Sequence, residues 1–180
     1  ITYISAQTLA LHPTKGDILL LGTGNTGAAD TGRGIYRSDD GGDSWKAVSS
    51  GLDGQNVSTL HWHPGGKLVA ATDSTAFMEP VPRVFTSGDG SSWTPFFGGN
   101  DDDHEAVIDA CVGEGGRIYM LLSELKLVTA GKDGRWRRLT KLDTAGTYMD
   151  HGARLYCATV AGKASFVVKV DGATLRYVEP

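Results

Sequence analysis

The sequence predicts an all-β fold, and three observations support this. Glycine accounts for 25 of the 180 residues, about 14% against a usual share of about 7%. Only 6 residues are proline while 40% are hydrophobic, so the glycines indicate tight turns rather than disorder or collagen. Short apolar runs alternate with turn sequences, and no segment shows the apolar spacing of a convincing helix.

A repeated apolar run organises the chain. The run begins at Asp17, Lys67, Arg117 and Arg154, each a polar residue followed by a mainly apolar stretch, and these starts are 50, 50 and 37 residues apart. A shorter apolar stretch precedes each run and a second hairpin follows it. The repeating unit is therefore four strands, A to D in chain order, in which the named run is strand B. Strand A is then expected at 9–11, 60–62, 110–112 and 147–149.

Four strands in a period of about 45 residues are typical of a β-propeller. We therefore predict one domain or fragment over residues 1–180, made of four four-stranded antiparallel blades at about 1–50, 51–99, 100–145 and 146–180. It is either a four-bladed ring or part of a larger propeller. Because residue 1 is Ile, we favour the fragment. An open array would expose apolar blade faces, so another chain or segment is expected to complete the propeller.

Charge and cysteine content exclude several classes of protein. With 17 Lys and Arg against 21 Asp and Glu, the net charge is −4, which argues against a dedicated nucleic-acid binder. No apolar run reaches the roughly 18 residues of a membrane span. Cys111 and Cys157 are too few for a metal cluster or a disulfide-rich miniprotein. They could form one bridge, but two buried thiols on neighbouring strands are the favoured interpretation.

One turn motif recurs in phase with the strands. The segment 38–45, SDDGGDSW, matches the Asp-box pattern S-x-D-x-G-x-[ST]-W, and 87–93, SGDGSSW, repeats it with one residue deleted. Worn copies surround Asp133 and Asp171. On these motifs the chain resembles the BNR/Asp-box β-propeller superfamily, which includes sialidases, xyloglucanases, sortilin-type receptor domains and photosystem II assembly factors. The resemblance implies an extracellular or periplasmic location.

The Asp-box residues are interpreted as structural. An Asp in such a turn accepts hydrogen bonds from turn N–H groups, Gly adopts angles closed to other residues, and Trp buries its ring against an adjacent blade. An Asp beside a Trp could also form a sugar subsite, but recurrence once per blade at turn positions favours structure. The predicted structural residues are Ser38, Asp40, Gly42 and Trp45 in the first copy, and Ser87, Asp89, Gly90 and Trp93 in the second.

Candidate ligand-binding residues lie at the other end of the blades. In a propeller the A–B and C–D turns share one end, and the B–C and D–A loops share the opposite one. The B–C loops of the first two blades, 23–33 and 73–83, are long and mix polar with apolar residues. Loops on a rigid scaffold usually carry binding. The candidates are Asn25, Asp30, Arg33, Phe77, Met78, Glu79 and Arg83.

Two segments resemble metal sites. The loop 99–105, GNDDDHE, contains Asp101, Asp102, Asp103 and Glu105, whose oxygens could hold calcium. A solvated acidic loop is the favoured alternative, and no other cofactor is expected. His61 and His63 form an H-x-H pair, but His63-Pro64 is in register with His12-Pro13, so a repeated turn residue is the simpler interpretation.

Three classes of function remain open. We favour a non-catalytic module that binds a protein or a glycan through its loops, with a structural or assembly module as one alternative. The other is a glycoside hydrolase. The resemblance to sialidases would imply an [FY]RIP motif. The chain lacks this motif, since Pro82-Arg83 matches it only faintly. Xyloglucanase-type inversion needs two facing carboxylates, and the sequence does not pair any, so catalytic residues remain unknown.

Overall fold

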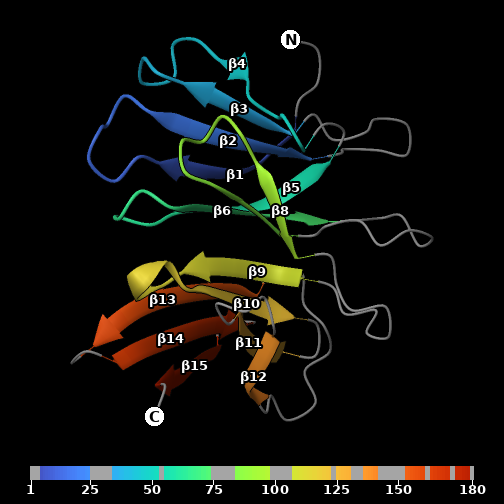
Figure 1. Cartoon of the computed structure of the whole chain (residues 1–180), viewed down its shortest axis with the longest axis vertical. Coiled ribbons are helices and arrows are strands. Elements are labelled where there is room, and N and C mark those ends of the chain that lie inside the picture. Colours follow the sequence, from blue (N-terminus) through green and yellow to red (C-terminus); the bar gives the residue numbers. More distant parts are fainter. Residues whose placement is uncertain are drawn as a thin grey trace. The chain divides into compact units, whose positions relative to one another are not determined.

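The structure, a computed structural model, describes residues 5–24, 34–52, 55–73, 84–97, 107–122, 125–130, 136–141, 153–160, 163–170 and 173–178. Among them the chain forms four antiparallel β-sheets, which we call blades 1 to 4 (Figure 1). The chain divides into two compact units, Ile1–His104 and Glu105–Pro180, so that each unit contains two blades.

The first unit has the predicted strand order in both of its blades. Blade 1 consists of β1 (Ser5–Leu11), β2 (Leu19–Gly24), β3 (Ile35–Ser38) and β4 (Lys46–Ala47), each hydrogen-bonded to the next. Blade 2 repeats this with β5 (Asn56–Trp62), β6 (Leu68–Asp73), β7 (Val84–Ser87) and β8 (Thr94–Phe97). The β1–β2 and β3–β4 connections lie at one end of the sheet, as do the β5–β6 and β7–β8 connections, and we call this the turn end.

The core of the first unit lies between its two sheets. Ala10, Leu20 and Ile35 form the back face of blade 1 and cluster with buried residues of blade 2. Gly22 allows the close approach, because a Cβ built there would lie 2.9 Å from the Val57 Cγ1 atom of the facing strand. Blade 2 contributes Val57 and a set that we call the front face of blade 2, with Trp62 packed beside it. The front face consists of Leu60, Leu68, Ala70, Phe85 and Trp93.

The second unit contains one complete blade and one with three described strands. Blade 3 consists of β9 (Val107–Val112), β10 (Ile118–Leu122), β11 (Lys126–Ala130) and β12 (Trp136–Lys141), with a short 3-10 turn (Glu114–Gly116) between β9 and β10. Blade 4 consists of β13 (Arg154–Val160), β14 (Lys163–Val170) and β15 (Ala173–Val178). The described part of blade 4 thus contains three strands, and the strand A predicted at 147–149 lies outside the described residues.

The strand assignment predicted for blade 4 is wrong. β13 packs against β9 and β10, as β5 packs against β1 and β2, so it is strand A of its blade rather than strand B. The first strands then begin at residues 5, 56, 107 and 154, a more even spacing than the apolar runs suggested. Strands A and B both bury apolar side chains against a neighbouring sheet, so the apolar pattern does not distinguish them. The worn Asp-box residue Asp171 lies outside the described residues.

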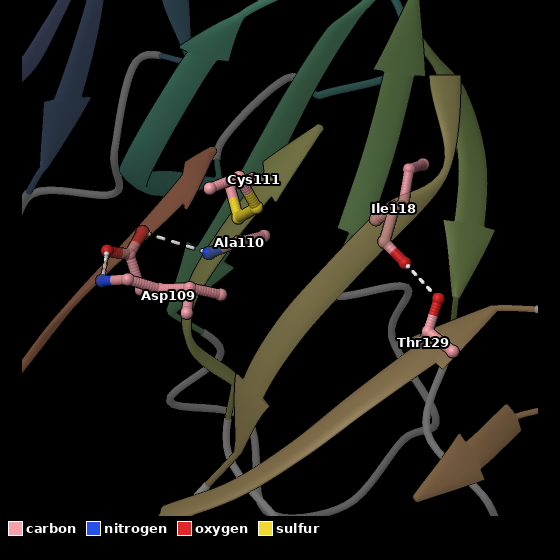
Figure 2. Close-up of a disulfide and its surroundings, with 7 residues drawn as sticks. Asp109, Ala110, Cys111, Ile118 and Thr129 are labelled. Atoms are coloured by element: carbon pink, nitrogen blue, oxygen red, sulfur yellow. Dashed lines mark hydrogen bonds between the residues drawn. A yellow bond between two sulfur atoms is a disulfide. The ribbon is translucent and has the colours of Figure 1, made fainter. Parts of the chain in front are cut away.

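The two cysteines form a disulfide between the first strands of blades 3 and 4. Cys111 of β9 and Cys157 of β13 are bonded, with their Cα atoms 6.1 Å apart (Figure 2). The interpretation as two free thiols is therefore wrong. These strands face each other across the interface of two blades, which brings the Cα atoms into the range that a bridge requires.

A buried carboxylate beside the disulfide joins the same two strands. Asp109 is 6% exposed, and its Oδ1 accepts a hydrogen bond from Ala110 N at 2.9 Å. Its Oδ2 accepts one from Leu155 N of β13 at 2.7 Å. Blades 3 and 4 are thus held together by a covalent bond and by a hydrogen bond from Leu155 N to the buried Asp109 side chain.

Candidate functional site

The candidate ligand-binding and metal-binding residues lie outside the part of the chain that the structure describes, so they stay predictions. This holds for the loop residues Asn25, Asp30, Arg33, Phe77, Met78, Glu79 and Arg83. It holds equally for Asp101, Asp102, Asp103 and Glu105 of the acidic loop. Both Asp-box turns are described.

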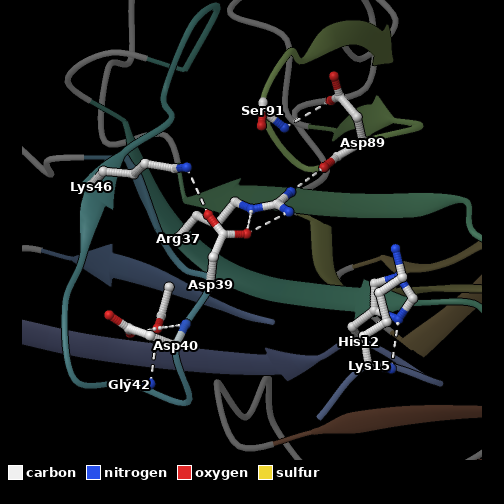
Figure 3. A network of polar contacts seen from close by, with 10 residues as sticks. His12, Lys15, Arg37, Asp39, Asp40, Gly42, Lys46, Asp89 and Ser91 are labelled. Atoms are coloured by element: carbon white, nitrogen blue, oxygen red, sulfur yellow. Dashed lines mark hydrogen bonds and ion pairs between the residues drawn. The ribbon is translucent and has the colours of Figure 1, made fainter. Parts of the chain in front are cut away.

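The first Asp-box is a turn closed by its own side chains (Figure 3). The Ser38 hydroxyl donates to Asp40 Oδ1 at 2.7 Å and accepts a hydrogen bond from Gly42 N at 2.8 Å. Asp40 Oδ1 also accepts from Ser44 N at 2.9 Å, and the Ser44 hydroxyl donates to Asp40 Oδ2. Trp45 Nε1 donates to Gly42 O at 2.9 Å. The turn therefore contains the hydrogen bonds that the sequence predicts.

These bonds keep the Asp40 carboxylate ionised. The hydroxyl and the backbone N–H of Ser44, followed by the Ser38 hydroxyl, lower the pKa of Asp40 to about 2. A group with so low a pKa has no proton to donate near neutral pH. The geometry and the pKa together give Asp40 a structural role in the turn.

The second Asp-box reaches the same arrangement with one residue fewer. The Ser87 hydroxyl donates to Asp89 Oδ1 at 3.0 Å and accepts from Gly90 N at 2.8 Å. Asp89 Oδ1 accepts from Ser91 N at 2.8 Å and Ser92 N at 3.0 Å. These two N–H groups are the main cause that lowers the pKa of Asp89. Gly90 has a φ of 72°, a left-handed conformation that other residues rarely adopt.

The two Asp-box tryptophans differ in burial. Trp93 is 5% exposed and belongs to the core between blades 1 and 2, as predicted. Trp45 occupies the same position in blade 1 but is only half-buried.

An arginine joins the two Asp-box turns. Arg37 of β3 donates through Nη1 to the carbonyl oxygen of Asp89, in the turn of blade 2, at 2.6 Å. Its Nη2 lies 2.7 Å from Asp39 Oδ1, and Lys46 Nζ lies 2.6 Å from Asp39 Oδ2 (Figure 3). Hydrogen bonds from Arg37 and Lys46 lower the pKa of Asp39. The sequence did not reveal this contact, because nothing in it placed Arg37 opposite a turn of the next blade.

The histidines that open the A–B turns act as turn residues. His63 Nδ1 accepts a hydrogen bond from Gly65 N at 2.9 Å. His12 Nδ1 likewise accepts from Thr14 N and Lys15 N, both at 3.2 Å. Among the described residues, no group of three His, Cys, Asp or Glu side chains could hold a metal ion. The interpretation as repeated turn residues is confirmed.

A shallow hollow of about 430 Å³ lies at the turn end of blade 2. Hydroxyl groups, glycine backbone and one amine line it, and its lining contains no carboxylate, so it offers hydrogen-bond donors without a proton-transfer pair. The lining residues are Gly65, Gly66, Lys67, Thr86, Ser87, Gly88, Ser92 and Thr94.

No helix within the described ranges is long and apolar enough to cross a membrane. No family model matches the sequence, and no curated protein matches it.

Solved structures match the fold over nearly the whole chain. A GH74 xyloglucanase from Xanthomonas campestris has a TM-score of 0.58 at 17% identity, and the match covers 97% of this chain and 30% of that one. YCF48 from Cyanidioschyzon merolae has a TM-score of 0.59 at 12% identity, covering 98% and 57%. YCF48 bound to a D1 peptide has a TM-score of 0.51 at 17% identity, covering 92% and 50%.

This chain therefore spans between 30% and 57% of the length of these three proteins. The identities are low, and the likeness concerns the fold. Four blade-like sheets and these structural neighbours together show that the chain has a β-propeller fold, as its resemblance to Asp-box proteins predicts.

Proposed function

We propose that this chain is a non-catalytic, extracytoplasmic module that binds a polypeptide or a glycan at its loop end, the end of blades 1 and 2 opposite the turn end. One observation carries the proposal. The two longest connections of the first unit, 25–34 between β2 and β3 and 74–83 between β6 and β7, leave neighbouring sheets at this same end. Long loops set side by side on a rigid sheet scaffold are a common basis for binding.

The first of these loops starts from a fixed base. Thr23 donates from both its backbone N and its Oγ1 to Gly34 O, at 3.0 and 2.9 Å. Gly34 N in turn donates to Gln55 O at 3.3 Å, just before the first strand of blade 2. Asn56 follows, and its buried Oδ1 accepts no hydrogen bond. A buried acceptor without a hydrogen-bond partner costs free energy. Its position at the base of the two loops therefore supports a polar contact with a ligand at the loop end.

The turn end supports the non-catalytic part of the proposal. Three carboxylates there, those of Asp39, Asp40 and Asp89, have lowered pKa values because each accepts hydrogen bonds from nearby groups. A glycosidase acid instead needs a raised pKa. These three carboxylates already accept hydrogen bonds within the turns or from Arg37.

The disulfide supports an extracytoplasmic setting. Cys111 and Cys157 are bonded to each other, and such bonds persist in oxidising compartments and are rare in the cytosol. Among the structural neighbours, YCF48 bound to a D1 peptide supports a polypeptide ligand. The GH74 xyloglucanase supports a glycan as the alternative ligand.

The test measures binding and turnover with the same samples. The whole chain with its disulfide intact is titrated with a D1 peptide and with xyloglucan oligosaccharides, and released reducing sugar is measured in parallel. We expect binding to one of the two probes without turnover. Phe77→Ala and Arg83→Ala are expected to weaken binding at least tenfold, because both residues lie in the loop between β6 and β7.

The matched control is Lys67→Ala, which alters a polar side chain at the turn end of the same blade and is expected to leave binding unchanged. Turnover abolished by a single carboxylate substitution would show that the chain is a hydrolase. Binding lost in Lys67→Ala but kept in both loop variants would place the site at the turn end. Either result overturns the proposal, as does the absence of binding to both probes.

A further inference from the structure

The hollow at the turn end of blade 2 is built by a single blade. Every lining residue lies between Gly65 and Thr94, within the first unit. Thr86 pairs with Val69 of β6 and with Thr94 of β8. Residues paired directly across antiparallel strands point to the same side of a sheet. The two threonine hydroxyls therefore stand side by side in the wall of the hollow.

Lys67 is the charged residue of this lining. It precedes β6, and β7 separates β6 from β8 in the sheet. The Lys67 Nζ atom nevertheless lies 5.7 Å from the centroid of the Phe96 ring of β8, so the side chain reaches across β7. The attraction of a cation to an aromatic face holds the ammonium there, over the strands that carry the two threonines. An ammonium offers three hydrogen-bond donors.

The two blades of the first unit can be compared position by position around their Asp-boxes. In blade 1, Arg37 precedes the serine that opens the box and Asp39 follows that serine. Arg37 pairs with Lys46 of β4. By the same count and the same pairing, the matching residues of blade 2 are Thr86, Gly88 and Thr94.

Blade 1 fills this place with a carboxylate held between two cations. Arg37 Nη2 lies 2.7 Å from Asp39 Oδ1, and Lys46 Nζ lies 2.6 Å from Asp39 Oδ2 (Figure 3). In blade 2 the matching residues are small, and a Cβ built on Gly88 would meet no atom within 4 Å. Blade 2 thus has room and hydrogen-bond donors at the place where blade 1 holds an anion of its own.

The acidic residue of the adjoining turn is already surrounded by donors. Asp89 is not part of the lining, and its Oδ1 accepts hydrogen bonds from Ser91 N at 2.8 Å and Ser92 N at 3.0 Å. Arg37 donates to the carbonyl oxygen of Asp89 at 2.6 Å, which brings a second cation to this turn. These groups offset the negative charge of Asp89 beside the hollow.

We propose that the hollow binds the carboxylate group of a small polar ligand, such as a sugar acid. Lys67 pairs with the carboxylate, because hydrogen bonds between charged partners are stronger than neutral ones. A volume of about 430 Å³ is of the size that holds small-molecule ligands, so the body of the ligand shares the hollow with its carboxylate. The hydroxyls that this body can contact are those of Thr86, Ser92 and Thr94. This site lies at the turn end and does not depend on the proposed function of the loop end.

The test titrates the whole disulfide-bonded chain with two matched pairs of probes and follows binding by calorimetry. D-Glucuronate is compared with its methyl ester, which keeps the sugar ring without the charge. N-Acetylglycine is compared with its amide, to represent a carboxylate from the end of a polypeptide. We expect a charged probe to bind at least tenfold more tightly than its neutral partner, and the pair with the larger difference identifies the source of the carboxylate. Equal affinity within both pairs, or no binding of either acid, overturns the proposal.

Two substitutions in the hollow test its geometry. Lys67→Ala is expected to lower the affinity for the preferred acid at least tenfold, whereas Lys67→Arg keeps the charge and should retain most of it. Gly88→Asp is expected to abolish binding, because it puts a carboxylate in the place that Asp39 has in blade 1. Asp39 also shows that this position of an Asp-box accommodates a side chain. Circular dichroism and Trp93 fluorescence check that each variant is folded.

The matched control is Lys46→Ala, which removes an ammonium from the turn end of blade 1 and is expected to leave acid binding unchanged. Full binding in Gly88→Asp would show that the ligand does not occupy the hollow and would overturn the proposal. Acid binding lost in Phe77→Ala but kept in Lys67→Ala would place this ligand at the loop end, which overturns it as well. Failure of peptide and xyloglucan binding at the loop end leaves this result untouched, so the two proposals fail separately.

Discussion

The two units join their blades by different means. Blades 1 and 2 meet through an apolar core, the ring of Trp93 and the contact of Arg37 with Asp89 O. Blades 3 and 4 meet through a core, the disulfide and the hydrogen bond from Leu155 N to Asp109. The unit with two well-formed Asp-boxes has no cysteine, and the unit whose boxes are worn has the bridge.

Both units thus have a packed apolar interface between their blades, but different additional interactions stabilise that interface. An Asp-box stabilises a turn through hydrogen bonds within a few residues, so its effect belongs to the folded state. A disulfide acts mainly by restricting the unfolded chain, at least in the chain-entropy account. The two units should therefore respond to different perturbations.

The largest expected effect separates the two tryptophans of the first unit. Trp93→Ala leaves a cavity in the core between blades 1 and 2, and such truncations cost about 3–5 kcal/mol of unfolding free energy. Trp45→Ala removes a ring that is only half-buried, and should cost about 1 kcal/mol. Urea unfolding at low protein concentration measures both. Equal losses would show that blade 1 is covered as blade 2 is.

Reduction of the disulfide should act on the second unit alone. Cys111 and Cys157 are separated by 46 residues, and removal of a bridge over such a loop costs about 2–4 kcal/mol. Amide hydrogen exchange with and without reductant is the measurement, because it reports each blade by its own peptides. Faster exchange is expected in β9, β10 and β13.

The double variant Cys111→Ser/Cys157→Ser is the control, since it should reproduce the reduced protein and no longer respond to reductant. Loss of protection in β1 to β8 would show that the units do not unfold independently, which would contradict the comparison.

The smallest effect is a pH dependence confined to the first unit. The folded pKa of Asp40 is about 2, below the value of about 3.9 for an unfolded Asp. The stability contributed by this carboxylate is therefore complete above about pH 5 and is lost progressively as the pH falls through 2. Asp40→Asn should be less stable than the parent protein at pH 7 and should approach its stability near pH 2. A constant difference over that range, measured by urea unfolding, would contradict the assignment.

Much of the fold followed from local chemistry in the sequence. Gly42 and Gly90 within matched motifs predicted the turns, and the apolar runs at Asp17, Lys67 and Arg117 predicted strand B of three blades. Blade 4 was misassigned because β13 buries apolar residues in the manner of a B strand. The disulfide was missed for a related reason, since only packing in space shows that β9 and β13 face each other.

Contacts between distant residues were not predictable from the sequence. Arg37 reaches a carbonyl oxygen 52 positions away, and no motif specifies a backbone acceptor. The exposure of Leu9 was also hidden, because its sequence pattern matches that of Leu60, which is buried. Leucines in matching sequence patterns thus differ in burial.

The pairing of a front face with the back face of its neighbour has a consequence for how such a chain can lengthen by gene duplication. A duplicated blade 2 would set the front face around Leu60 against the back face that includes Val69, Ala71 and Val84, instead of Ala10, Leu20 and Ile35. All six of these residues are small or branched and apolar, and all are buried. A copy inserted there would meet a surface of similar chemistry. Whether the copy packs would then depend on how well the shapes of the two faces fit. A blade packed on the face of blade 4 that carries Arg154, Lys169 and Arg176 would instead have to pair these cations.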